Sequence, residues 1–305
     1  MTSSSPKTIA IFGATGAQGA PVVKEALSKG HIVRAVARDV AKIAAVHPDA
    51  IAVAADLSDE VAVAKALHGV DAAFLHFPMP SGPDDSQNWA AAFFAAAHQV
   101  NLPLLVYVTG GPSGDRFPSS AIVDGTTQGM KAVLGSGIPS IVLQSAVYLE
   151  NLQPEIFLPD LRSEGKLDYP PIPKTMKMKM KMKMKMQWTS HLDQATLAVA
   201  AMSRPDLAGQ SFEIGTPQAL SGAELAELMG KWVGRDVAFD PMTPAEFGTR
   251  VGDALGSPGA AFALGDLYGA IAKLDGDDMA VDTGALEATF GVKLTSVADH
   301  INSWS

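Results

Sequence analysis

The strongest constraint on the fold of this chain is a glycine-rich turn close to its start. An apolar run at residues 7–12, KTIAIF, consists mostly of β-forming residues, and a helical pattern follows the turn. Between them stands GATGAQG, in which Gly13 permits a tight turn, Gly16 lets backbone N–H groups approach a pyrophosphate, and Gly19 lets helix and strand pack closely. A strand, a glycine-spaced turn and a helix in this order predict a dinucleotide bound at the positive end of the helix.

The same alternation of elements continues through the first half of the chain. Further β-forming runs stand at residues 31–37, 51–55, 70–76, 104–108 and 138–143, and helical patterns separate them. Strands that alternate with helices form parallel sheets with right-handed crossovers. We therefore predict an α/β fold with a Rossmann-like, doubly wound parallel sheet and a smaller, mixed and mainly helical C-terminal part.

The composition excludes several classes of protein. The 305 residues carry a formal net charge of −9 at pH 7, so no nucleic-acid surface is expected. The chain has no cysteine, which excludes disulfides and thiolate metal sites, and its aspartates lack the spacing of a calcium loop. It contains neither a signal-peptide pattern nor an apolar run of membrane-spanning length. We expect a cytoplasmic monomer or homodimer that binds a small-molecule substrate and neither metal, membrane nor nucleic acid.

The residue after the second strand indicates which dinucleotide is bound. Arg38 stands where a guanidinium forks onto the 2′-phosphate of NADP, whereas Asp39 suits the 2′-hydroxyl of NAD or the N-cap of the next helix. We favour NADP(H). The turn spacing, Gly-x-x-Gly-x-x-Gly, is typical of short-chain dehydrogenase/reductase relatives. In that superfamily Asp56 and Leu57 resemble the pair that brackets adenine, although Asp56 also suits a helix cap.

The carboxyl ends of the fourth and fifth strands are expected to meet the ribose and nicotinamide. Phe77, Pro78 and Met79 form an apolar loop there, and His76 beside them is structural or catalytic. Thr109 resembles the polarising serine of short-chain dehydrogenases, or it simply ends its strand. The residues predicted to hold the cofactor are Gly13, Thr15, Gly16, Ala17, Gln18, Gly19, Arg38, Asp56, Leu57, Phe77, Pro78, Lys131 and Tyr148.

The tyrosine–lysine pair of short-chain dehydrogenases is incomplete in this chain. Lys131 has the place of the lysine on the fifth helix, but Thr127 stands four residues earlier, where the tyrosine would be. A threonine hydroxyl is far too weak an acid to replace tyrosine. Lys131 would hold the nicotinamide ribose or polarise a carbonyl, unless it is a solvated helix lysine. We predict Lys131 and Thr109 as the catalytic residues.

Several segments together resemble the NmrA-like family of atypical short-chain dehydrogenases/reductases. They are the first turn, Arg38, Lys131, residues 134–151 (LGSGIPSIVLQSAVYLEN) and the helix that begins at His191. The resemblance implies an NADP(H)-binding Rossmann-like domain and a smaller part that closes a cleft over the cofactor. For function it implies one of two classes: a quinone, dye or isoflavone-type reductase, or a non-catalytic NADP(H) sensor. The chain departs from the family at residues 144–146, Gln-Ser-Ala, where relatives often carry an Arg-Pro-Gly type of turn.

We expect residues 1–151 to form the NADP(H)-binding domain and residues 152–305 the substrate or cap region. Within the latter, residues 189–214 are expected to return to the main sheet. Helix N-caps are predicted at Ser221 and Thr243, each with a glutamate three residues later. The residues expected to contact substrate are Met79, Tyr148, Asn151 and Trp188.

Residues 176–186 alternate strictly between methionine and lysine. In an extended chain this alternation places the methionines on one face and the lysines on the other. Three interpretations stay open: a lengthened surface loop, a strand whose methionine face lines the cleft or a subunit contact, and a cationic arm for anionic partners. The negative net charge of the chain weakens the third.

The sequence supports two functional hypotheses. The first is an NADPH-dependent oxidoreductase that transfers hydride to an electron-poor planar acceptor, such as a quinone, an enone, an aromatic carbonyl or a dye. Such acceptors need little help from a general acid, which agrees with the missing tyrosine. The second is a non-catalytic regulator of the NmrA type that senses NADP(H) through the same cofactor residues.

Overall fold

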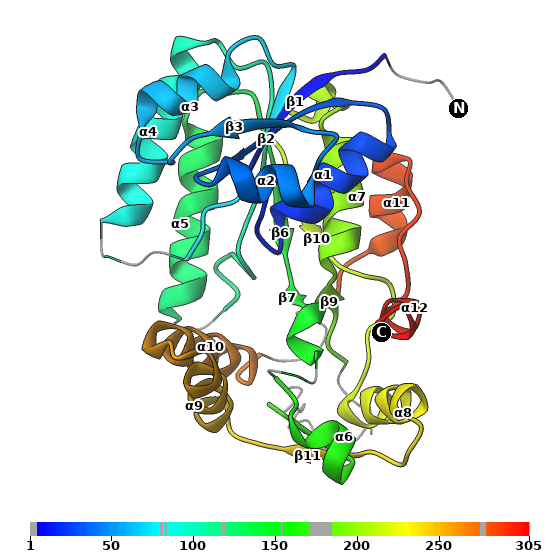
Figure 1. Ribbon diagram of the computed structural model, residues 1–305. Helices are drawn as coiled ribbons and strands as arrows, with labels where there is room; N and C mark the ends of the chain where they lie inside the picture. The colour runs from blue at the N-terminus through cyan, green and yellow to red at the C-terminus, as the bar shows by residue number, and fades with distance from the viewer. Residues whose placement is uncertain are drawn as a thin grey trace.

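Seven parallel strands form the central sheet of the protein (Figure 1). The computed structural model describes residues 5–79, 82, 84–117, 120–153, 155, 157–170, 185–274 and 279–304. The strands are β1 (Thr8–Phe12), β2 (Ile32–Ala37), β3 (Ile51–Ala54), β4 (Ala72–Leu75), β5 (Leu105–Val108), β6 (Ser140–Ser145) and β10 (Ser211–Ile214). They lie in the order β10-β6-β5-β4-β1-β2-β3, and each neighbouring pair is parallel. The predicted Rossmann-like, doubly wound sheet is confirmed.

The sheet supplies two cores because successive residues of a strand point to opposite faces. Ile9 and Ile11 of β1 enter one core, whereas Ala10 and Phe12 enter the other. The first face is covered by α1 (Gly19–Ser28), α2 (Val40–Val46), α7 (His191–Ala201) and α11 (Thr283–Phe290). The second face is covered by α3 (Glu60–Leu67), α4 (Asp85–Gln99) and α5 (Ala121–Gly135). Burial on both faces explains why the central strands β4 and β5 are wholly apolar.

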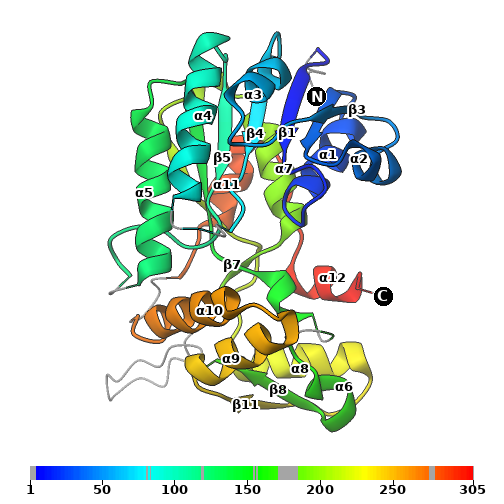
Figure 2. The same cartoon turned by 60° about the vertical axis from the view of Figure 1, so that its left-hand side comes forward.

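A smaller, mainly helical part lies at the carboxyl end of the sheet (Figures 1 and 2). Its elements are β7 (Val147–Tyr148), η1 (Leu149–Leu152), α6 (Asp160–Glu164), β8 (Lys166–Tyr169), β9 (Trp188–Thr189), α8 (Gly222–Val233), β11 (Ala238–Pro241), α9 (Pro244–Leu255), α10 (Pro258–Ile271) and α12 (Val297–Asn302). Buried aromatic side chains, Tyr169, Trp188, Phe247 and Tyr268, occupy its core. Helices α9 and α10 pack closely at Gly252, which has no side chain. A Cβ at this position would stand only 2.4 Å from the Cβ of Ala261.

The chain returns to the main sheet after the smaller part has begun. As predicted for residues 189–214, β10 pairs with β6, and α7 packs against α1 beside the 3₁₀ turn η2 (Pro205–Leu207). The chain returns a second time with α11, whose Leu286 and Phe290 join the same core. The sequence did not predict this second return. The division at residue 151 stays a prediction, because Phe117 and Val123 contribute to the core of the smaller part.

The predicted helix caps are present. Ser221 and Thr243 each form a complete capping box, with Glu224 and Glu246 respectively. Most of the methionine–lysine tract, residues 176–184, lies outside the described residues. At its end, buried Met186 exchanges two backbone hydrogen bonds with Leu220, with N···O distances of 2.9 and 3.0 Å. Nζ of Lys185 lies 3.0 Å from Oε1 of Glu224.

The described residues form neither a membrane-spanning helix nor a metal-binding cluster. No helix in this part of the chain has the length and hydropathy needed to cross a membrane. No group of three or more histidine, aspartate or glutamate side chains within it is placed to hold a metal ion.

Candidate cofactor and substrate site

The glycine turn joins β1 to α1 at the carboxyl edge of the sheet. Gly13 has a φ of 70°, in the left-handed region that favours glycine, and its carbonyl accepts a hydrogen bond from Gly16 N at 2.9 Å. Gly19 lies so close to this carbonyl that a Cβ would stand 2.3 Å from the oxygen. These contacts bring the first turn of α1 directly against the glycine turn; the approach of Gly16 to a pyrophosphate stays a prediction.

The N-terminus of α1 has no side-chain cap, although Ala20 N donates to Gly16 O at 3.0 Å. Its N-cap residue, Gln18, makes no side-chain cap, and the first turn contains no acidic residue. By contrast, Asp39 Oδ1 caps α2 by accepting from Ala41 N at 2.9 Å and Lys42 N at 3.1 Å. An uncapped helix N-terminus behind a glycine turn fits a bound pyrophosphate, whose charge the helix dipole stabilises.

Arg38 and Asp39 differ in how free their side chains are. Asp39 is committed to the cap of α2, which agrees with one of its two interpretations. Arg38 is exposed and makes no ion pair or hydrogen bond within the described part of the chain. Asp56 accepts from Ser58 N and Ser58 Oγ, and these hydrogen bonds, together with nearby Arg38, lower the pKa of its carboxyl. Exposed Arg38 is therefore available to a phosphate, whereas the Asp56 carboxylate is held by Ser58.

A buried histidine that the sequence did not single out supports the glycine turn. His47, immediately after α2, is only 2% exposed, and its Nε2 lies 2.9 Å from the carbonyl oxygen of Ala14. Ala14 N in turn donates to Val36 O at 3.2 Å. His47 therefore connects α2 to the turn and limits its movement. A lone histidine at a helix end gives no sequence signal for this contact.

The ends of β4 and β5 form a second part of the site. His76 Nδ1 lies 3.3 Å from Val108 O, and burial lowers the pKa of its imidazole to about 4, so the ring is neutral near pH 7. The ring of Phe77 lies 5.7 Å from that of Tyr107, and Pro78 and Met79 are exposed. Thr109 is fully buried and donates from Oγ1 to Gly111 O at 2.7 Å.

Thr109 also connects β5 to β6, because its Oγ1 accepts from Ser145 N at 3.0 Å. Its hydroxyl is thus committed to the protein in this conformation, as expected of a residue that ends a strand. Ala146, which follows Ser145, donates from N to Thr189 Oγ1 at 2.8 Å. The Gln-Ser-Ala segment is therefore held by threonine hydroxyls from two neighbouring elements.

Tyr148 lies where several segments of the chain converge. Its hydroxyl lies 2.8 Å from Gln18 Oε1 and from Gln194 Oε1, 3.2 Å from Thr109 O and 3.1 Å from Ser145 Oγ. Burial raises the pKa of this phenol far above its usual value. Tyr148 therefore stays protonated, and its ring and hydroxyl connect the glycine turn, the end of β5 and helix α7.

A histidine and a glutamate lie directly behind Tyr148. The ring of His191, the first residue of α7, lies 4.5 Å from the ring of Tyr148. Glu150 Oε1 accepts from His191 N at 2.9 Å, and Oε2 lies 3.5 Å from His191 Nδ1. Burial lowers the pKa of His191 to about 4 and raises that of Glu150 to about 7. From the sequence, both residues were known only as part of the segments that resemble the NmrA-like family. Their burial depends on tertiary packing, so their contact was not predicted.

Lys131 and Thr127 lie on α5, away from this cluster of contacts. The Lys131 side chain is 63% exposed, and its Nζ lies 3.5 Å from Asp115 Oδ1. Thr127 is buried and donates to Val123 O at 2.7 Å while it accepts from Gly114 N at 2.8 Å. In this conformation Lys131 is a solvated helix lysine, and the Thr127 hydroxyl serves the loop before α5.

Trp188 and Asn151, two of the predicted substrate contacts, belong to the smaller part. Trp188 is fully buried, and its Nε1 lies 3.5 Å from Tyr169 Oη. A side chain without exposed surface offers no wall to a ligand in this conformation. Asn151 is half-buried in η1 and hydrogen-bonds the Tyr268 hydroxyl. Met79, by contrast, is 61% exposed at the edge of the sheet.

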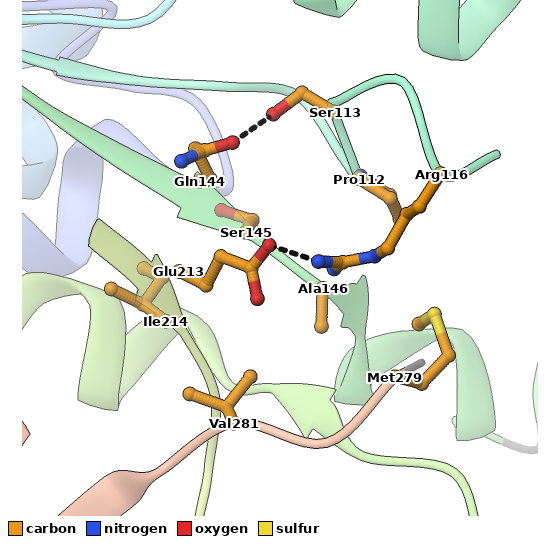
Figure 3. Close-up of a pocket in the computed structure, with 10 residues that line it drawn as sticks. All are labelled: Pro112, Ser113, Arg116, Gln144, Ser145, Ala146, Glu213, Ile214, Met279 and Val281. Carbon is orange, nitrogen blue, oxygen red and sulfur yellow. Dashed lines mark hydrogen bonds and ion pairs between the residues drawn. The ribbon is translucent and has the colours of Figure 1, made fainter. Parts of the chain in front are cut away.

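A small pocket lies between the end of β6, strand β10 and the segment before α11 (Figure 3). Ser113 Oγ donates to Gln144 Oε1 at 2.7 Å on one side, and Arg116 pairs with Glu213 on the other. The remaining lining residues are Pro112, Ser145, Ala146, Ile214, Met279 and Val281. The pocket has room for about one water molecule, so it is too small for a cofactor or a planar acceptor in this conformation.

The sequence was compared with known protein families. The model of the NmrA-like family matches residues 5–292. This chain belongs to the NmrA-like family. The match includes the glycine turn, Arg38, Tyr148 and helices α7 and α11, so it covers both parts of this NmrA-like protein.

This NmrA-like protein is similar in sequence to a named enzyme and in fold to several solved structures. The NAD(P)H azoreductase of Xenophilus azovorans is 29% identical over 264 residues, which are 85% of this chain and 86% of the azoreductase. An NADPH-dependent quinone oxidoreductase from Escherichia coli, solved with NADPH, superposes with a TM-score of 0.75 and 21% identity over 96% of this chain and 98% of that one. NmrA, a negative transcriptional regulator solved with NAD, superposes with a TM-score of 0.71 and 16% identity over 99% and 96% of the two chains. Both structures share the fold of this protein.

Proposed function

We propose that this protein is an NADPH-dependent reductase that transfers hydride to an electron-poor, planar acceptor such as a quinone, an enone, an aromatic carbonyl or a dye. The observation that carries the proposal is a site with two halves at one edge of the sheet. One half is the N-terminus of α1, which has no side-chain cap, together with exposed Arg38 directly after β2. The other is an apolar strand-end loop that contains no tyrosine positioned as a general acid.

NADP(H) would be held mainly by backbone groups and by Arg38. Gly13, Thr15, Gly16, Ala17, Gln18 and Gly19 form the turn that faces the pyrophosphate, and Arg38 recognises the 2′-phosphate. Asp56 and Leu57 would flank the adenine. Phe77, Pro78 and Tyr148 would line the nicotinamide half, and Lys131 is proposed to reach the ribose. When bound, the cofactor supplies a hydride to the acceptor.

The acceptor would lie over the carboxyl ends of β4 and β5. Exposed Met79 and the Phe77–Tyr107 aromatic pair offer apolar contacts to a planar ring. We keep Thr109 and Lys131 as the proposed catalytic residues, which would place or polarise the acceptor, and Asn151 as a proposed substrate contact. Trp188 would contribute only after the smaller part moves, because it is buried in the core.

The second candidate is a non-catalytic regulator that senses NADP(H). The similarity in fold to the regulator NmrA favours it, whereas the azoreductase relative favours the enzyme. Both candidates use the same cofactor residues. They differ in whether an acceptor is reduced.

The decisive experiment mixes the purified protein with NADPH and a panel of quinones, azo dyes, cationic dyes and enones. Loss of the absorbance of reduced cofactor measures turnover, and calorimetry measures cofactor binding. Turnover with at least one class of acceptor supports the enzyme. Tight NADPH binding without turnover across the panel would rule out the reductase and favour the regulator.

Three further assignments belong to the same proposal. Residues 1–151 form the cofactor-binding domain, and residues 152–305 form the substrate or cap region apart from residues 189–214. The protein works in the cytoplasm, as its lack of cysteine suggests. It is a monomer or a homodimer, which light scattering of the purified protein would decide.

A further inference from the structure

The buried pair of Glu150 and His191 has a chemical use that the proposed function leaves open. Glu150 Oε1 accepts from His191 N, which accounts for one carboxyl oxygen. Oε2 is buried and makes no hydrogen bond among the described residues, although it lies 3.5 Å from His191 Nδ1. A buried carboxyl oxygen without a partner is costly when it carries charge, so the geometry favours the protonated acid.

His191 extends from this carboxyl toward the cofactor edge of the sheet. Its ring packs on Tyr148, whose hydroxyl contacts Thr109 O at the end of β5 and Gln18 Oε1 in the glycine turn. His76 at the end of β4 is near enough to lower the pKa of His191. The His191 side chain keeps 14% of its exposure, and within the described structure its Nε2 makes no hydrogen bond and is not fully buried. Nδ1 faces Glu150, and Nε2, on a side chain that keeps some exposed surface, is left for another partner.

We propose that His191 and Glu150 form the proton relay of the reductase, with His191 Nε2 protonating the reduced acceptor and Glu150 Oε2 supplying a proton to His191 Nδ1. The inference rests on the proposed function, and it assigns the source of the one proton that a reduced quinone or azo bond takes up even though such acceptors need less acid help than a carbonyl. His191 is the catalytic residue of the pair, because it alone reaches the acceptor. Glu150 acts through His191 as a positioning and proton-storing residue.

The reaction balances with one hydride and one proton. Hydride adds two electrons to a quinone or an azo bond and leaves an anionic oxygen or nitrogen. The Nε2–H bond of neutral His191 breaks as the new O–H or N–H bond forms, and the O–H bond of Glu150 breaks as Nδ1–H forms. Water then reprotonates Nε2, and the Nδ1 proton returns to the carboxylate.

The charges around the pair fit this role. On α7, Asp193 raises the pKa of Glu150, and on α12, His300 lowers it, while burial is the largest effect and leaves the pKa at about 7. His191 itself, with a pKa of about 4, is neutral near pH 7. The relay needs protonated Glu150 and neutral His191, so it works between these two values. Above about pH 7 the Glu150 carboxyl is deprotonated, and reduction of an acceptor that requires a proton slows.

The acceptor itself provides the control. A quinone needs hydride and a proton, whereas a cationic triphenylmethane dye is a carbocation that takes hydride alone. We expect Glu150→Gln, which keeps an oxygen for His191 N, to lower the quinone-to-dye ratio of kcat by about a hundredfold, the low end of general-acid effects. The same variant should lose the fall in quinone turnover above pH 7. Glu227→Gln, at an exposed position on α8, is the matched control and should leave the ratio unchanged.

A second variant and a cofactor-free measurement complete the test. His191→Phe keeps an aromatic ring on Tyr148 without a transferable proton, and it should lower the same ratio. In the protein without NADPH, the infrared band of a protonated carboxyl should disappear as pH rises through about 7 in the wild type and be absent from Glu150→Gln. An unchanged ratio in both variants, or a Glu150 carboxyl that is already ionised at pH 5, overturns the relay. Wild-type protein that reduces no acceptor at all overturns the proposed function, and the relay with it.

Discussion

Replacing Gly19 by alanine tests the geometry of the glycine turn most directly. The new Cβ would stand 2.3 Å from Gly13 O and 2.7 Å from Gly13 C. Both are backbone atoms that cannot rotate away, so the Gly13 carbonyl must shift by roughly 1 Å to restore normal contact. That shift disrupts the 2.9 Å hydrogen bond from Gly16 N to Gly13 O. Overpacking costs about 1–3 kcal/mol and the lost hydrogen bond about 1 kcal/mol, so we expect a loss of roughly 2–4 kcal/mol.

Calorimetry and cofactor titration measure the effect of Gly19→Ala. For 305 residues, an unfolding entropy of about 2 cal/mol/K per residue converts this loss to a fall in Tm of about 3–6 °C. NADPH should bind more weakly, because Gly16 N moves with the turn. Gly125→Ala is the control: this helix position has nothing within 4 Å of a Cβ, so alanine should leave Tm equal or slightly raised. Equal Tm and equal NADPH affinity in Gly19→Ala and wild type would refute the close contact.

Three further predictions follow from the same site. Arg38→Ala should raise the Kd for NADPH about 10- to 100-fold, as expected for a lost charge-assisted contact, and leave the Kd for NADH nearly unchanged. Lys231→Ala on α8 is the control. Equal losses of affinity for both cofactors would show that Arg38 does not bind the 2′-phosphate. Tyr148→Phe should lose about 1–3 kcal/mol in urea unfolding because buried oxygens lose their hydroxyl partner, and an unchanged midpoint would contradict this. His76 and His191 have folded pKa values of about 4, below the ordinary value of 6.5, so they bind fewer protons in the folded state. Stability should therefore fall as pH drops from 6.5 toward 4, and His191→Phe should reduce that slope in urea titrations; an unaltered slope would show that His191 is not the titrating group.

The parts of the fold that depend on local sequence were predictable. The glycine turn follows from the spacing of Gly13, Gly16 and Gly19. Each of these positions has a backbone conformation or a close contact, set by residues nearby in the sequence, that favours glycine. The parallel sheet follows from alternating strands and helices, and the caps at Ser221 and Thr243 from a four-residue pattern. The second return of the chain, with α11, was missed because nothing near Leu286 indicates which face of which sheet it covers.

The long-range parts of the site could not be derived in the same way. The contact of His47 with Ala14 and that of Tyr148 with Gln18 join residues 33 and 130 positions apart. The perturbed pKa of Glu150 depends on burial, which a sequence pattern does not report. The full burial of Trp188 likewise depends on tertiary packing, so its role as a substrate contact stays a prediction.

The two returns of the chain have a consequence for how the protein is made. Strand β10 and helices α7 and α11 complete a core that begins with β1, so its contacts join residues nearly 280 positions apart in sequence. During synthesis, the first 151 residues leave the ribosome before the segments that cover one face of their sheet exist. Folding of the sheet must therefore wait for almost the whole chain, which predicts slow folding and exposure to chaperones during translation. The two parts should then unfold together rather than as separate units.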